Sequence, residues 1–257
     1  MSWYLENKNG LKIYRCSTVN DSTIVQAFST RSTGNMGLHT GDIVEQVIAN
    51  RRTFLKTLDL DINNLVAAGQ VHGTKIRVIT ESQVGLGAYS IENAIPGTDA
   101  LITNKRGPVL SIYTADCLPV FLYDPVTPTI GIVHAGWRGT IARIVELTVG
   151  KMVKEFNTNP AECRVALGPA IGPDCFRVNE DVAKQFRLVD PAVVYQDKSG
   201  YQVDLNVFNW KLLLKSGIRS ENIDMADICT VCNREDFFSY RAEDGTIGRM
   251  MGIISLK

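Results

Sequence analysis

Two histidines and one cysteine have the residue types and positions that a shared chemical site requires. Cys117 follows an apolar run, His134 ends another, and His72 lies at the end of a third strand-like segment. Loops at strand ends are where α/β proteins usually keep their catalytic and binding groups. We therefore expect His72, Cys117 and His134 to converge on one site, although no two of them are close in sequence.

One thiolate and two imidazoles match a catalytic zinc site, in which three protein ligands leave a fourth position for water or substrate. Zinc in such a site lowers the pKa of a bound water molecule to about 7. Without a metal, Cys117 could instead be a nucleophile, with His134 or His72 as its base. The spacing of the three residues does not separate these alternatives.

Two polar residues beside these ligands are further candidates. Asp116 ends an apolar run, where a lone carboxylate needs a partner or solvent. We expect it to orient a ligand or to act as a general acid or base. Arg138 lies where a helix is predicted to open, and free N–H groups there would suit a phosphate or carboxylate. The alternative is a tight strand–helix turn with Thr140 as the N-cap.

The segments between these residues predict buried strands and amphipathic helices. Residues 109–113, 119–123 and 130–134 are dense in β-branched and aromatic residues, which is typical of buried strands. Helical spacing predicts helices over 42–58, with Asp42 as N-cap, over 139–156 and over 203–217. Because consecutive strands recur without regular βαβ alternation, we expect an α/β fold of mixed sheets covered by helices, in one domain.

Composition limits the classes of partner. The chain has 257 residues, and its 27 basic and 27 acidic residues balance to a net charge of zero. This balance gives no electrostatic reason to expect nucleic acid or an anionic membrane as a partner. No apolar run approaches the roughly 20 residues that span a bilayer. The first residues lack the basic-then-apolar order of a secretory signal, so we expect a cytoplasmic protein.

Six cysteines in a chain of this length indicate reduced thiols rather than a disulfide framework. Cys229 and Cys232 form a C-x-x-C pair. A zinc ribbon would need a second such pair, and a thioredoxin-like redox pair would need a βα context that this segment does not clearly show. We therefore interpret Cys229 and Cys232 as structural.

Seven segments are more specific together than singly. They are QVHGTKI, GTDALIT, TADCLPVFLYDP, GIVHAGWRGT, ALGPAIGPDCFRV, DICTVCNREDFFSYR and GRMMGII. In this order, from about Phe28 to the C-terminus, they resemble the bacterial YlmD/YfiH-like family. Its members are also called laccase-domain or multicopper polyphenol oxidase-like proteins, or FAMIN-type purine nucleoside phosphorylases. The resemblance implies a single-domain four-layer α/β/β/α sandwich with mixed sheets.

The resemblance also implies a function. In the family, residues matching His72, Cys117 and His134 bind a catalytic zinc. The implied reactions are phosphorolysis of adenosine, inosine, guanosine and methylthioadenosine, and deamination of adenosine to inosine, so purine nucleosides and phosphate are the expected partners. Arg241 has at most a supporting role in substrate binding. The laccase name suggests copper, but three histidines are too few for a multicopper oxidase.

Two other classes of function stay open. One is a metal-free cysteine–histidine hydrolase or amidase acting on a peptidoglycan precursor, which metal content would distinguish from the zinc enzyme. The other is a non-catalytic binding protein that uses the same pocket. For that class, we expect Cys117→Ala to leave the biological activity unchanged.

Overall fold

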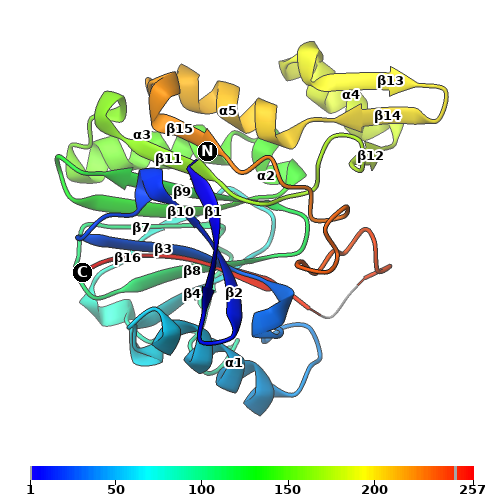
Figure 1. The fold of residues 1–257 in the computed structure, drawn as a ribbon. Coiled ribbons are helices and arrows are strands. Elements are labelled where there is room, and N and C mark those ends of the chain that lie inside the picture. The colour runs from blue at the N-terminus through cyan, green and yellow to red at the C-terminus, as the bar shows by residue number, and fades with distance from the viewer. Residues whose placement is uncertain (1, 246–247) are drawn as a thin grey trace.

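The computed structural model describes residues 2–245 and 248–257, and it contains two large sheets that face each other (Figure 1). The first has seven strands in the order β1-β2-β3-β16-β8-β4-β6. Their bounds are β1 (Trp3–Lys8), β2 (Leu11–Cys16), β3 (Ile24–Ser29), β16 (Met250–Leu256), β8 (Val109–Thr114), β4 (Leu65–Gly69) and β6 (Ile95–Pro96).

The second sheet has six strands in the order β15-β11-β9-β10-β7-β5. Their bounds are β15 (Ile223–Met225), β11 (Arg164–Leu167), β9 (Leu118–Asp124), β10 (Thr129–Ala135), β7 (Ala100–Thr103) and β5 (Ile76–Val78). Both sheets contain parallel and antiparallel pairs. The strands predicted over 109–113, 119–123 and 130–134 are confirmed as β8, β9 and β10, and every residue of these strands is buried.

Helices cover the two outer faces, so the molecule has four layers. In Figure 1, α1 (Val44–Thr57) lies below the seven-stranded sheet. On the far side, α2 (Trp137–Ile141), α3 (Ile144–Phe156) and α5 (Leu205–Lys215) lie above the six-stranded sheet. One apolar cluster, which includes Phe28 and Phe121, fills the space between the sheets. Two others lie beneath the helices. The predicted four-layer α/β/β/α arrangement is confirmed.

A smaller unit extends from one end of the helical layer. It consists of a three-stranded sheet, in the order β12-β14-β13, and one helix (Figure 1). The bounds are β12 (Arg177–Val178), β14 (Gly200–Val203), β13 (Val194–Asp197) and α4 (Glu180–Val189). Phe186 and Phe208 pack edge to face in its apolar cluster, which joins α4 to α5. This sheet was not predicted from the sequence, because its strands are short and largely exposed.

Two predictions about helix ends are wrong. The N-cap of α1 is Ile43 rather than Asp42, whose carboxylate accepts hydrogen bonds from the Asn35 side chain and the Ile43 N–H. The helix predicted over 139–156 is divided into α2 and α3. Arg143 adopts a left-handed conformation (φ 61°) between them, and this conformation ends one helix and begins another.

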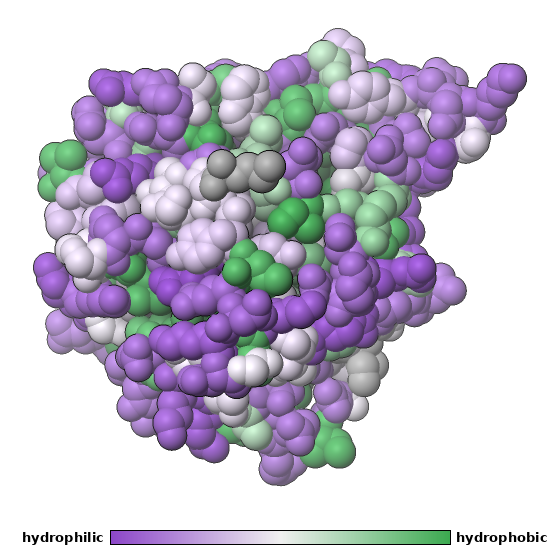
Figure 2. Space-filling model, in the orientation of Figure 1, coloured by the Kyte–Doolittle hydropathy of each residue, from purple (hydrophilic) through white to green (hydrophobic). Residues whose placement is uncertain are grey.

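The surface is mostly polar on the face drawn in Figure 2, where hydrophobic residues form only small groups between hydrophilic ones. Most large apolar side chains are in the core clusters instead. Among the residues that the structure describes, none of the helices is both long enough and apolar enough to cross a bilayer.

Candidate active site

The two sheets are joined by links that carry two of the three predicted ligands. Cys117 lies in the short link from β8, in the seven-stranded sheet, to β9, in the six-stranded sheet. His72 lies in the loop from β4 to β5, which makes the same crossing. His134 is the penultimate residue of β10. The ligand atoms of the three residues all lie within 4.8 Å of one another, so the predicted convergence is present in the structure.

Asp99 fixes the orientation of this trio. It directly precedes β7, and the pairing of β7 with β10 places it beside His134. One oxygen of its fully buried carboxylate lies 2.8 Å from Nδ1 of His134. The same carboxylate accepts hydrogen bonds from the backbone N–H groups of His72 (2.9 Å) and Gly73 (2.8 Å). Asp99 therefore holds both histidines and leaves Nε2 of His134 free to face Cys117.

The backbone is unusual at two positions of the site. His72 has φ of 60° and Asp116 has φ of 87°, a region in which residues other than glycine are uncommon. Such conformations cost about 1–3 kcal/mol each and persist where neighbouring contacts fix them. Asp99 provides those contacts for His72. For Asp116, they come from Thr230, Arg241 and the N–H of Ile171.

The protonation of the trio follows from these contacts. Burial opposes ionisation of the Cys117 thiol, but the adjacent His134 and His72 lower the pKa of Cys117 to about 6. Burial also disfavours the charged form of His134, yet the Cys117 thiolate and the Asp99 carboxylate raise the pKa of His134 to about 9. Between pH 6 and pH 9, Cys117 is therefore a thiolate and His134 is an imidazolium. A thiolate is the form of cysteine that binds metals.

The donor set suits zinc. Four-coordinate zinc has bonds of about 2.0–2.3 Å, which places its ligands roughly 3.3–3.8 Å apart. Donor atoms within 4.8 Å of one another can reach this geometry by small side-chain movements. The backbone of Gly136 lies close to the side chains of His72 and Cys117. A Cβ at Gly136 would lie 2.8 Å from Cδ2 of His72 and 3.3 Å from Sγ of Cys117.

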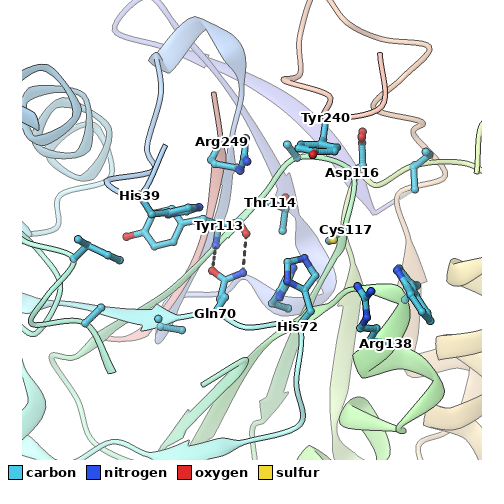
Figure 3. Close-up of a pocket in the computed structure, with 18 of the residues that line it drawn as sticks. His39, Gln70, His72, Tyr113, Thr114, Asp116, Cys117, Arg138, Tyr240 and Arg249 are labelled. Atoms are coloured by element: carbon cyan, nitrogen blue, oxygen red, sulfur yellow. Dashed lines mark hydrogen bonds between the residues drawn. The ribbon is translucent and has the colours of Figure 1, made fainter. Parts of the chain in front are cut away.

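The trio opens into a cavity of about 790 Å³ that lies at the ends of both sheets. This volume is typical of a small-molecule site. Aromatic and apolar residues line much of it, and these include Tyr113, Trp137, Ile171, Phe176 and Tyr240. Figure 3 shows Arg138 and Arg249 on opposite sides of His72 and Cys117, so positive charge borders the candidate metal ligands on two sides.

The other predicted site residues line the same cavity, each with defined contacts. Arg138 lies over the Trp137 ring, 4.3 Å from its centroid. The Arg241 guanidinium donates hydrogen bonds to the carbonyls of Cys175 (2.9 Å) and Arg177 (3.1 Å). Thr140 does not cap α2, whose N-cap is Gly136.

Asp116 is nearly buried, and both of its oxygens are engaged. Oδ1 accepts a hydrogen bond from the Thr230 hydroxyl (2.7 Å), and Oδ2 accepts one from the N–H of Arg241 (2.7 Å). These bonds connect the link that carries Cys117 to the chain segment that carries Arg241. They favour an orienting role for Asp116.

Four residues that line the cavity or contact its ligands were not predicted from the sequence. Asp99 gives no local signal, because its partner His134 is 35 residues away. Gln70 uses both ends of its amide to pair with the backbone of Tyr113, at 2.8 and 2.7 Å, as the dashed lines in Figure 3 show. His39 lies in the loop before α1, and Arg249 lies directly before β16. Burial lowers the pKa of His39, and the cations Arg249 and Arg51 lower it further.

Comparisons with known proteins identify the family of this chain. The family model "Multi-copper polyphenol oxidoreductase laccase" matches residues 21–257. "Purine nucleoside phosphorylase YlmD" of Bacillus subtilis is 32% identical over 251 residues, which cover 93% of this chain and 90% of that protein. "Adenosine deaminase RL5", from an unknown prokaryotic organism, is 33% identical over 232 residues, which cover 84% of this chain and 88% of that protein.

A solved structure has the same fold. The Bacillus licheniformis hypothetical protein YfiH superposes with a TM-score of 0.93 at 32% identity, over 98% of this chain and 99% of that one. The resemblance to YlmD/YfiH-like proteins that the seven sequence segments predicted is thereby confirmed. This chain belongs to the multi-copper polyphenol oxidoreductase laccase family, whose members similar to it include YlmD and YfiH proteins.

Proposed function

We propose that this protein is a purine nucleoside enzyme that cleaves nucleosides with phosphate. The observation that carries the proposal is the convergence of His72, Cys117 and His134 on a cavity of about 790 Å³. That volume accommodates a nucleoside together with phosphate. The printed names of two relatives, a purine nucleoside phosphorylase and an adenosine deaminase, support the same class of substrate. A cytoplasmic location is part of the proposal, since purine nucleosides and phosphate are both available there.

The main reaction is phosphorolysis of adenosine, inosine, guanosine or methylthioadenosine. A phosphate oxygen forms a bond to C1′ of the ribose, the bond from C1′ to the purine nitrogen breaks, and the purine leaves with the electron pair and gains a proton. The products are ribose 1-phosphate, or its methylthio derivative, and the free base. Deamination of adenosine to inosine, with water as the co-reactant and ammonia as the second product, is the additional activity.

Different residues of the cavity bind different parts of the substrates. Arg138 and Arg249 supply positive charge for the phosphate, on two sides of the trio. Tyr113, Trp137 and Tyr240 offer aromatic surface for the flat purine. Asp116 acts by position, since its carboxylate fixes the Arg241 backbone beside the cavity. Arg241 supports the substrate side of the cavity through its bonds to the carbonyls of Cys175 and Arg177.

Zinc is the proposed metal, held by His72, Cys117 and His134. Zinc bound there would act as a Lewis acid that polarises a substrate oxygen or lowers the pKa of water. Asp99 keeps His134 in the tautomer that presents Nε2 to the metal. Copper-based phenol oxidation is disfavoured, because three histidines in the whole chain cannot supply the imidazoles of several copper centres.

The test is to measure zinc content and turnover together. Wild-type protein is incubated with adenosine or inosine, with and without phosphate, and the free base, ribose 1-phosphate and inosine are quantified. Cys117→Ala is compared with Cys163→Ala, which removes a buried thiol outside the site. We expect phosphate-dependent release of free base by wild type and by Cys163→Ala. We expect Cys117→Ala to lose turnover together with the zinc bound by the trio. No turnover of any nucleoside by zinc-loaded wild type would refute the proposal.

A metal-free cysteine–histidine hydrolase or amidase is the second candidate. Its supporting observation is that Cys117, His134 and Asp99 are also arranged as nucleophile, base and orienting carboxylate. Zinc-stripped wild type distinguishes the two candidates. If it retains full activity on nucleosides or on a peptidoglycan-type amide, and alkylation of Cys117 abolishes that activity, then the second candidate is correct.

A further inference from the structure

Three cysteines form a second cluster outside the candidate active site. Cys175 lies in the loop between β11 and β12, and Cys229 and Cys232 follow β15. Their sulfur atoms all lie within 4.8 Å of one another, and the sulfurs of Cys175 and Cys232 are 3.6 Å apart. The C-x-x-C pair that the sequence analysis interpreted as structural therefore has a third thiol, contributed by a distant loop.

The geometry matches thiolate coordination of a soft ion. Zinc–sulfur bonds of about 2.3 Å in a tetrahedral site place the sulfurs roughly 3.8 Å apart. The cluster needs only small rotations of side chains to reach this spacing. Soft thiolate ligands select zinc or monovalent copper over harder cations. Cys232 is exposed and the other two cysteines are partly exposed, so an ion can enter from solvent.

One backbone N–H group and one cationic side chain lie beside the cysteine cluster. The N–H of Gly172 donates a hydrogen bond to Sγ of Cys229 (3.2 Å). The Arg241 guanidinium binds the carbonyl of Cys175 and adds a positive charge nearby.

We propose that Cys175, Cys229 and Cys232 form a second metal site, for a thiolate-bound zinc ion whose fourth position is open to solvent. The site is independent of the proposed nucleoside activity, because it shares no ligand with the trio around Cys117. The position of this zinc ion gives it a structural role. The ion joins the loop that contains Gly172 and Cys175 to the segment that contains Cys229 and Cys232.

One of these segments lines the active-site cavity, and the other contacts Asp116, which also lines it. Thr230, next to Cys229, donates a hydrogen bond to Asp116, and so does the N–H of Arg241. Ile171 and Phe176, on the other segment, line the cavity. Zinc at the cysteine cluster therefore fixes the segment that holds Asp116 and, through it, the link that carries Cys117.

The experiment counts zinc ions in chelator-stripped, reduced full-length protein that is then titrated with zinc. We expect two equivalents for wild type, one for Cys232→Ser and one for Cys117→Ala. The double variant binds none, and the control Cys163→Ala binds two. Cys175→Ser is a second variant of the cluster and also binds one. Thermal melts confirm that each variant is folded, and Cys232 is the mildest site to change because its side chain is exposed.

Cobalt as a probe separates the two sites by spectroscopy. Charge-transfer absorption grows with the number of thiolates on the ion, and the cluster offers three thiolates where the active site offers one. We therefore expect cobalt-loaded Cys117→Ala to absorb roughly threefold more strongly in this region than cobalt-loaded Cys232→Ser. The proposal is overturned if wild type and Cys232→Ser bind the same number of zinc ions. It is also overturned if reduced wild type binds one zinc and reduced Cys117→Ala binds none.

Discussion

Asp99→Asn is the substitution that most directly tests how the candidate ligands are held. The Asp99 carboxylate accepts three hydrogen bonds of 2.8–2.9 Å, from Nδ1 of His134 and from the N–H groups of His72 and Gly73. An asparagine has one acceptor oxygen and one NH₂ group. If the oxygen keeps its bonds to the two histidines, then the NH₂ group faces the Gly73 N–H, and two donors meet in a buried place.

The expected magnitude follows from these contacts. A buried N–H that loses its partner costs about 1–3 kcal/mol. Outer hydrogen-bond partners of metal ligands typically contribute about 10–100-fold in metal affinity or activity, which corresponds to about 1.4–2.8 kcal/mol. We therefore expect Asp99→Asn to weaken zinc binding by about 10–100-fold. We also expect it to lower the free energy of unfolding by about 1–3 kcal/mol.

Asp124→Asn is the matched control. Asp124 is also fully buried, and it accepts hydrogen bonds from the N–H groups of Val126 (2.9 Å) and Thr127 (3.2 Å). It lies at the opposite end of the β9–β10 pair from His134. We expect a comparable loss of stability with unchanged zinc affinity. Urea denaturation measures the stability of both variants, and competition with a coloured chelator measures the affinity. Equal zinc affinities for Asp99→Asn and wild type would refute the positioning role of Asp99.

Three further predictions concern the packing and the protons of the site. Gly136→Ala places a methyl group 2.8 Å from the His72 ring, so we expect about tenfold weaker zinc binding with a native-like circular dichroism spectrum. Arg51→Met removes hydrogen bonds to three buried carbonyls, and we expect a loss of about 2–4 kcal/mol in urea denaturation with zinc affinity unchanged. Because the pKa of Cys117 is lowered to about 6 and that of His134 is raised to about 9, zinc binding should displace one proton from this pair at pH 7.5. Calorimetry in buffers of different ionisation enthalpy should show that the number of displaced protons approaches two below pH 6 and zero above pH 9. A number of displaced protons that does not change with pH would contradict the assigned protonation.

The strands of the core were predictable because they read as continuous apolar runs. All residues of β8, β9 and β10 are buried, and such strands need no tertiary information to be recognised. The break between α2 and α3 was not predictable in this way. The apolar stripe continues through it, and only the left-handed backbone at Arg143 separates the two helices.

The candidate ligands were predictable by residue type, but their supporting contacts were not. His72, Cys117 and His134 stand out because imidazole and thiol groups at strand ends are chemically informative. Asp99 and Cys175 depend on which strands and loops become neighbours. Asp99 meets His134 only through the pairing of β7 with β10, and Cys175 meets Cys232 across 57 residues of chain. The spacing of apolar residues along the sequence does not indicate which strands pair or which loops become neighbours.

Two of the links that cross between the sheets, those that carry His72 and Cys117, have a consequence for folding. His72 and Cys117 are held at ligand distance only when both sheets have formed and have docked face to face. Contacts between such distant parts of a chain form late, because the loops between them must close first. A metal that needs all three residues thus binds the finished sandwich and not its separate halves. The colour of cobalt at Cys117 during refolding would then report the moment at which the two sheets join.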